Sequence, residues 1–182
     1  MSTSTKDPSI VYRRFIEFEE KAAAIYLQFA SHFSKDRQLS AFWLDMAMQE
    51  KQHAGLLQFC VADRLFAADL PDRAGIEEIT NISKRLEKRA ADPKLSVEES
   101  VTIAVELEAS EINGIYKHLT TPLHCSAYLL RRKIVTCLNH VDEVIKAASK
   151  IGVRNGKMKE LIRLRNTCCD EWKKPKRLRP AS

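Results

Sequence analysis

Apolar side chains recur every three or four residues along most of this chain of 182 residues. That spacing places the apolar side chains on one face of an α-helix. Strict alternation of apolar and polar residues, which is typical of strands, is absent, and the long segments are rich in Ala, Leu, Glu and Lys. The pattern therefore predicts an all-α protein made of long amphipathic helices.

Turn and capping residues divide this pattern into separate helices. Asp7-Pro8 is a start signal, with Asp as N-cap and Pro at the first helical position. Ser96 and Glu99 form a capping box, and Gly152 marks a helix end. The expected helices span about Ser9–Phe33, residues 37–68, Ala74–Ala91, residues 96–119 and Leu123–Ser149, with a short helix over Lys157–Trp172.

The segment from Ala74 to Ala91 is mostly polar and lies between two long helices, so it suits a crossover connection of the kind that ferritin-like four-helix bundles contain. The length of the chain favours one domain with a proper core. We expect a bundle of residues 8–150, followed by a C-terminal extension of residues 151–182.

Positive charge is concentrated in that extension. From Lys150 to Ser182 there are eleven Lys and Arg against three Asp and Glu, a net +8, while the whole chain carries +6. The preceding 149 residues therefore carry about −2. We interpret the basic segment from Lys173 onward as a solvated tail. Attraction to nucleic acid, to an acidic membrane surface or to an acidic redox partner is the alternative.

The five cysteines are odd in number and have no spacing typical of a secreted disulfide fold. No Cys-x-x-Cys occurs, so the sequence encodes neither a zinc ribbon nor a rubredoxin-type iron centre. No window of about 18 residues is free of charge, and the first residues lack the pattern of a signal peptide. The cytoplasm is therefore the expected location.

Candidate chemistry begins with Glu50 and His53, which are three residues apart and so share one helix face. They fall on the same stripe as Met46 and Leu57. A carboxylate and an imidazole at this spacing can hold one metal ion. Helix bundles that bind two metal ions take a Glu from each of two helices and a Glu-x-x-His from each of two others.

Two other predicted helices supply carboxylates. Glu19 precedes Tyr26 by two turns, so the two side chains can share a face. Glu108 and Glu111 are an i, i+3 pair, and Tyr116 follows Glu108 by eight residues. Like charges at that spacing repel and raise each other's pKa, so the pair makes most sense with a cation between its members.

The last long helix contains His140, with Cys137 three residues before it where a Glu would complete the pattern. A thiolate can bind iron or zinc, but it favours softer metals than a carboxylate does. The favoured interpretation of Cys137 is a small buried hydrophobe, with metal ligation as the alternative.

Together these residues resemble the erythrin domain of rubrerythrins, over about Ile10 to Lys150. In that family a ferritin-like four-helix bundle holds a di-iron centre that reduces hydrogen peroxide to water. The resemblance implies tyrosines that hydrogen-bond the ligating carboxylates at Tyr26 and Tyr116. The metal-ligand positions that it implies are Glu19, Glu50, His53, Glu108, Glu111 and His140.

The resemblance implies a non-haem di-iron oxidoreductase of the peroxidase or ferroxidase type, which would use hydrogen peroxide or dioxygen. The rubredoxin-like domain usual in the family is missing here, so electrons would come from a separate donor protein. With Cys137 in place of a Glu, zinc or another divalent metal is an alternative to iron. A homodimer is expected, because the family resemblance implies one and two-fold dimers are the commonest assembly.

Two other classes of function remain open. In the first, the metal site has decayed and the bundle serves as a scaffold, regulator or partner-binding module, with its Glu residues merely favouring helix formation. In the second, the basic tail tethers the bundle to an anionic surface.

Overall fold

The computed structural model describes residues 7–67, 70–116, 139, 141–152 and 156–173. These residues form helices and no strands, which confirms the predicted all-α class. Residues 141–150 are helical as well. The named helices are α1 (Pro8–His32), α2 (Arg37–Ala62), α3 (Arg73–Ala90), α4 (Val97–Glu111), the π-helix η1 (Ile112–Tyr116) and α7 (Gly156–Lys173).

Each of the first four helices begins at a side chain that accepts a backbone N–H. The carboxylate of Asp7 accepts from Ser9, and Pro8 follows at the first helical position, as predicted. Asp36 and Asp72 cap α2 and α3 in the same way. The Ser96 hydroxyl accepts from the Glu99 amide at 3.1 Å, which is the first half of the predicted capping box.

The predicted end of the second helix near residue 68 is wrong, because α2 ends at Ala62. Arg64 has a φ of 55°, in the left-handed region, and the Leu65 amide donates to the Cys60 carbonyl at 2.8 Å. This six-to-one bond is the Schellman closure of a helix, here formed without glycine. The buried hydroxyl of Tyr12 then accepts from the Ala67 amide at 3.0 Å and ties the outgoing chain to α1.

The helix predicted to continue to residue 119 changes character at residue 111. There α4 gives way to η1, which ends at Tyr116, and residues 117–119 lie outside the described part. Of the helix predicted over Leu123–Ser149, the described part covers residues 139 and 141–149, which are helical. Gly152, with a φ of 82°, follows its end as predicted, and α7 confirms the predicted C-terminal helix.

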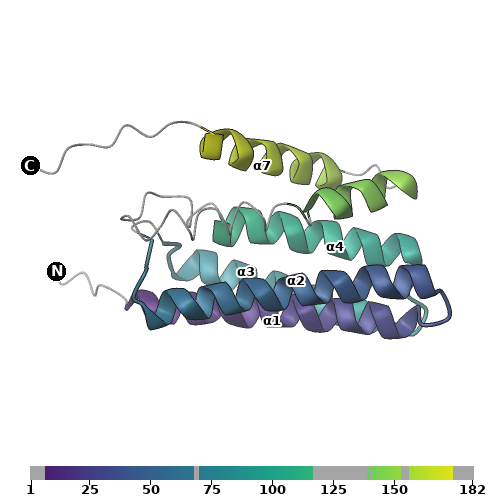
Figure 1. Cartoon of the computed structure of the whole chain (residues 1–182), viewed down its shortest axis with the longest axis horizontal. Helices are drawn as coiled ribbons and strands as arrows, with labels where there is room; N and C mark the ends of the chain where they lie inside the picture. Colours follow the sequence, from purple (N-terminus) through teal and green to yellow (C-terminus); the bar gives the residue numbers. More distant parts are fainter. Residues whose placement is uncertain (1–6, 68–69, 117–138, 140, 153–155, 174–182) are drawn as a thin grey trace, which may run out of the picture.

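The first two helices form an antiparallel hairpin and pack along their whole length (Figure 1). Helix α4 lies between this hairpin and α7, and α3 packs against both α1 and α4 (Figure 1). Their apolar faces meet in one continuous core, which also includes Met158 and Leu161 of α7. In the part of the chain described, no helix is both long and apolar enough to cross a membrane.

Candidate metal centre

The α1–α2 hairpin holds three buried polar side chains close together. Glu19 comes from α1, and Glu50 and His53 come from one turn of α2. The three residues are at most 4% exposed. His53 Nδ1 lies 2.9 Å from Glu50 Oε2 and 3.5 Å from Glu19 Oε2. The i, i+3 spacing of Glu50 and His53 thus produces the shared face that the sequence predicts.

Glu111, the last residue of α4, brings a third carboxylate to this place. One ligand atom from each of Glu19, Glu50, His53 and Glu111 lies within 4.8 Å of the other three. We call these residues the four-donor group. Three carboxylates and one imidazole from three helices, all buried, form an arrangement that could hold a metal ion.

Burial governs the protonation of these carboxylates. Loss of hydration raises the pKa of Glu19 to about 7, although hydrogen bonding to His53 opposes the rise. Desolvation also raises the pKa of Glu111 well above its ordinary value, and the charges of Glu19, Glu50 and Glu108 add to that rise. Without a metal ion, Glu19 and Glu111 therefore hold a proton more readily than an exposed carboxyl group does. A divalent cation would replace these protons.

The four-donor group suits a divalent transition metal by its chemistry and its size. Carboxylate and imidazole ligands bind iron, manganese and zinc. Such ligands lie about 2.0–2.2 Å from the ion, so two donors on opposite sides of it are about 4.4 Å apart. The donors of this group lie within 4.8 Å of one another, so its widest pairs would move closer together around a bound ion.

Glu108 lies one turn before Glu111 and is also fully buried. The Tyr26 hydroxyl donates to Glu108 Oε1 at 2.8 Å. Desolvation, followed by the charges of Glu108 and Glu50, raises the pKa of Tyr26 well above its ordinary value. The phenol therefore stays protonated and acts as a donor. Trp43 of α2 stacks on the Tyr26 ring at 5.6 Å between centroids, with an interplanar angle of 15°, and fixes its position.

The helix widens directly after Glu111. The five residues of η1 form a π-helix, a rare element that is frequent at functional sites. Within it, Gly114 lies against Ile79 of α3, because a Cβ at position 114 would come within 2.5 Å of Ile79 Cδ1 and 2.8 Å of its Cγ1. The absence of a side chain at Gly114 lets the wide turn approach α3 closely.

The structure thus brings together four of the residues selected from the sequence, and it buries Glu108 beside them with Tyr26 as a hydrogen-bond donor. The backbone of Tyr116 ends η1, but its side chain is not among those described. Cys137 and His140 lie outside the described residues. The roles of Cys137 and His140 as metal ligands, and of Tyr116 as a hydrogen-bond donor to a ligand, therefore stay predictions.

Sequence reasoning missed three features around this site: the Trp43 ring, the π-helix and the contact of Gly114 with Ile79. One signal was available for Trp43. It precedes Glu50 by seven residues, which is two helical turns, so the two share a face of α2. The other two features depend on how α3 packs against η1.

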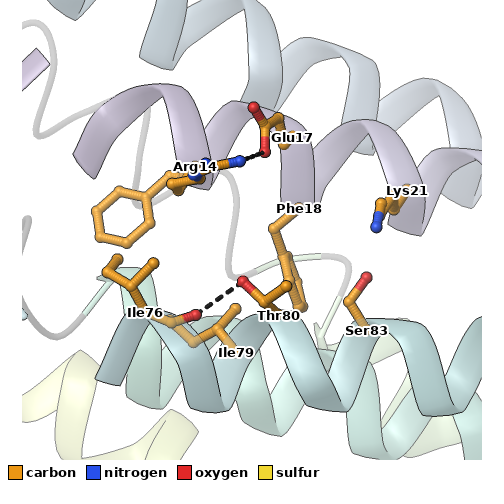
Figure 2. Close-up of a pocket in the computed structure, with 9 residues that line it drawn as sticks. Arg14, Glu17, Phe18, Lys21, Ile76, Ile79, Thr80 and Ser83 are labelled. Carbon is orange, nitrogen blue, oxygen red and sulfur yellow. Dashed lines mark hydrogen bonds and ion pairs between the residues drawn. The ribbon is translucent and has the colours of Figure 1, made fainter. Parts of the chain in front are cut away.

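A separate cavity of about 30 Å³ lies between α1 and α3 (Figure 2). It is lined by Phe18 and Ile79 and shares no residue with the four-donor group. The buried Ser83 hydroxyl faces it and has no hydrogen-bond partner among the described residues. Since a cavity of about 15 Å³ or more can hold a water molecule, this space suits a water bound to Ser83.

Comparison of the chain with models of known protein families, with curated proteins and with solved structures found no match.

Proposed function

We propose that this chain is a ferritin-like di-metal carboxylate protein of the rubrerythrin type. It would bind iron and reduce hydrogen peroxide, or oxidise iron(II), with electrons supplied by a separate donor protein. The observation that carries this proposal is the four-donor group, whose three carboxylates and one imidazole lie in the core within 4.8 Å of one another. Acidic groups are costly to bury unless a ligand neutralises them, and an iron ion would do so.

In this proposal Glu19, Glu50, His53 and Glu111 hold one ion. The second ion would take Glu108 together with His140, as the family resemblance implies, with Cys137 as an alternative ligand. Bound iron would supply the electrons that reduce the peroxide. The surrounding apolar core would exclude water from the site.

Metal binding would require that carboxylates of the site lose their protons. Glu19 and Glu111 have raised pKa values because they are buried, so they would release protons when a metal binds. Tyr26 would keep the Glu108 carboxylate in one orientation through its 2.8 Å hydrogen bond. A carboxylate that a hydrogen bond already holds in one orientation loses less conformational entropy when it binds a metal ion.

The test is the metal content per chain after anaerobic loading with iron(II), followed by the rate of iron oxidation by peroxide and by dioxygen. We expect about two iron ions per chain and faster oxidation by peroxide. Fewer than one iron per chain would overturn the proposal. One ion per chain would restrict it to the four-donor group.

A second candidate function rests on Cys137, which stands where the family pattern has a carboxylate. A bundle with a decayed site would act as a scaffold or partner-binding module. The substitution Cys137→Glu separates the two candidates. If it creates iron binding that the natural chain lacks, the natural site is degenerate. If the natural chain already binds two iron ions, the second candidate is excluded.

A further inference from the structure

The small cavity between α1 and α3 continues into a larger hollow at the surface. The hollow has a volume of about 630 Å³ and lies between the start of α1 and one side of α3. Arg14, Ile76 and Thr80 line both spaces, so the two form one elongated pocket. We call it the α1–α3 pocket, with its inner end at Lys21 and Ser83 and its outer end at Ile10.

The wall of the α1–α3 pocket is largely apolar. Phe15 and Phe18 of α1 and Ile79 of α3 line the inner cavity and are at most 8% exposed. At the outer end, Ile10 is 57% exposed and lines the hollow, so apolar surface continues from the core to the solvent. Concave sites with apolar walls and a few placed polar groups are typical of small-molecule binding.

A buried hydroxyl group lies at the inner end of the pocket. Ser83 is 2% exposed, and its Oγ has no hydrogen-bond partner among the described residues. Figure 2 shows this hydroxyl directed into the cavity, toward the side of Lys21. Because a buried polar group without a partner is costly, the hydroxyl would gain from donating a hydrogen bond to a ligand.

Positive charge is in excess at the same end. Two of the four cationic side chains that line the pocket, Arg14 and Arg73, form ion pairs with glutamates of their own helices. The other two, Lys21 and Lys84, form no ion pair within the part of the chain that the structure describes. Lys21 lies across the cavity from Ser83, and Lys84 follows Ser83 in the sequence. An anionic group at Ser83 would therefore accept a hydrogen bond close to two positive charges.

We propose that the α1–α3 pocket binds a medium-chain carboxylic acid in its ionised form. The inner cavity has a volume of about 30 Å³. A water-sized group needs roughly 10–15 Å³ of such space, so the two oxygens of a carboxylate match it in size and would displace bound water. The carboxylate would accept from Ser83 beside Lys21, and the hydrocarbon chain would lie along Phe18 and Ile76 toward the hollow. The pocket shares no residue with the four-donor group, so the proposal does not depend on metal binding.

Calorimetric titration of the metal-free full chain with sodium octanoate tests the proposal. For a ligand of about ten non-hydrogen atoms, we expect a single site with a dissociation constant of about 0.1–1 mM. Octanol lacks the charge and should bind at least about tenfold more weakly, and the cationic octylamine should not bind. Absence of octanoate binding up to about 10 mM overturns the proposal. Equal affinity for octanol and octanoate also overturns it.

A series of ligands of increasing length tests the role of the hollow. From butanoate to hexanoate to octanoate, each added CH₂ group should tighten binding by up to about fourfold, because it leaves water for the apolar wall. An affinity that stays constant along the series would show that only the anionic group is held, and it would overturn the assignment of the hollow to a hydrocarbon chain.

Two substitutions test where the ligand binds. Ser83→Ala removes the hydroxyl donor and should weaken octanoate binding by about tenfold. Lys21→Met removes one nearby charge and should weaken it by about threefold. Lys35→Met is the matched control, since it changes the net charge equally but lies in the turn between α1 and α2. It should leave the affinity unchanged.

The natural chain already buries the Ser83 hydroxyl without a protein partner among the described residues, so Ser83→Ala should fold as the natural chain does. Circular dichroism during heating checks this for each variant, and Lys21→Met keeps the test valid if Ser83→Ala does not fold. Octanoate binding that survives both pocket substitutions overturns the proposal. So does binding that the control weakens as much as Lys21→Met.

Discussion

Two carboxylates on α4, Glu106 and Glu111, differ in the charged groups around them. Glu106 faces α3, where it pairs with Arg85 at 3.0 Å and with Arg89 at 2.6 Å. Glu111 lies only five residues further along, on the core side of the same helix, where the charges of Glu19, Glu50 and Glu108 act on it. The side chain of Glu106 is 13% exposed, whereas Glu111 is fully buried.

The difference separates a structural role from a binding role for the same residue type. The arginines of α3 are always charged, so they remain the counterions of Glu106. These ion pairs join two helices, and Glu106 needs neither a proton nor a metal ion to balance its charge. The pKa of Glu111 is raised because burial and neighbouring carboxylates oppose its ionisation. A metal ion that bound Glu111 would displace the proton that burial favours on this carboxyl group.

The largest effect is expected when a carboxylate of the four-donor group loses its charge. Glu111→Gln removes one ligand of a buried ion, so we expect metal affinity to fall by about 100-fold or more. In the metal-free chain the same substitution should be neutral or stabilising, because it removes an acid that is costly to ionise. Isothermal titration with zinc or anaerobic iron(II) measures the affinity, and chemical denaturation measures the stability.

Glu106→Gln is the matched control on the same helix. It removes the negative charge that pairs with Arg85 and Arg89 but changes no member of the four-donor group. Metal affinity should therefore stay within about twofold of the natural chain. Equal losses in the two variants would show that Glu111 acts through the stability of α4 rather than as a ligand.

The next effect is a dependence of stability on pH that reverses when metal binds. The pKa of Glu19 is about 7 in the folded chain and 4.5 in its ordinary state. A raised folded pKa gives stability that is complete below about 4.5 and is lost as the pH rises through about 7. Glu111 acts in the same direction. The melting temperature of the metal-free chain should therefore be several degrees lower at pH 8 than at pH 5.

With metal present the sign should reverse, because ligands bind the ion only after losing their protons. Scanning calorimetry at both pH values, with and without zinc, measures the two slopes. Glu19→Gln should flatten the slope of the metal-free chain. A metal-free chain that gains stability between pH 5 and pH 8 would contradict the expected burial of these acids.

A smaller effect is expected at Tyr26, which contacts the site through Glu108. Tyr26→Phe keeps the ring stacked on Trp43 but removes the hydrogen bond to Glu108. Loss of a group that orients a ligand typically costs about tenfold or more in metal affinity. Tyr12→Phe is the control, because it also removes a buried tyrosine hydroxyl, but one that accepts from the Ala67 amide and does not contact the site. It should lower stability and leave metal affinity unchanged.

Local signals made most of the helices predictable. Asp7 and Ser96 cap helices because their side chains bond the next exposed amides, which depends on nearby residues alone. The end of α2 was not predictable in this way, because Arg64 adopts the left-handed conformation that usually favours glycine. There a tertiary bond from Ala67 to Tyr12 directs the chain.

Part of the four-donor group was predictable for a similar reason. Glu50 and His53 share a face by spacing alone, whereas Glu19 and Glu111 were predicted as ligands because the family resemblance implies those positions. The stack of Tyr26 on Trp43 depends on the register between α1 and α2, and the π-helix depends on the contact of Gly114 with α3. Neither dependence is visible in the order of residues along one helix.

Substitution at Gly114 should perturb the site through the π-helix. Alanine usually stabilises a helix by about 1 kcal/mol relative to glycine. Here the added Cβ would meet Ile79, so Gly114→Ala should instead destabilise the chain by about 1 kcal/mol and weaken metal binding. Ile79→Ala removes the obstructing atoms, so a double-mutant cycle should show a favourable coupling. If Gly114→Ala is stabilising by itself, the contact does not constrain η1.

The smallest effect is expected when the ion pairs of Glu106 with the arginines of α3 are weakened. Arg89 pairs with Glu106 and with Glu99 at 2.8 Å, and its side chain is 30% exposed. Because partly exposed pairs contribute little, Arg89→Met should lower the free energy of unfolding by about 1 kcal/mol or less, and salt should reduce this difference. Metal affinity should not change, since the pairs are satisfied within the α3–α4 interface. A shift in metal affinity with Arg89→Met would mean that the fixed charges of α3 act on the four-donor group through α4, and the two carboxylate groups would then be one electrostatic system.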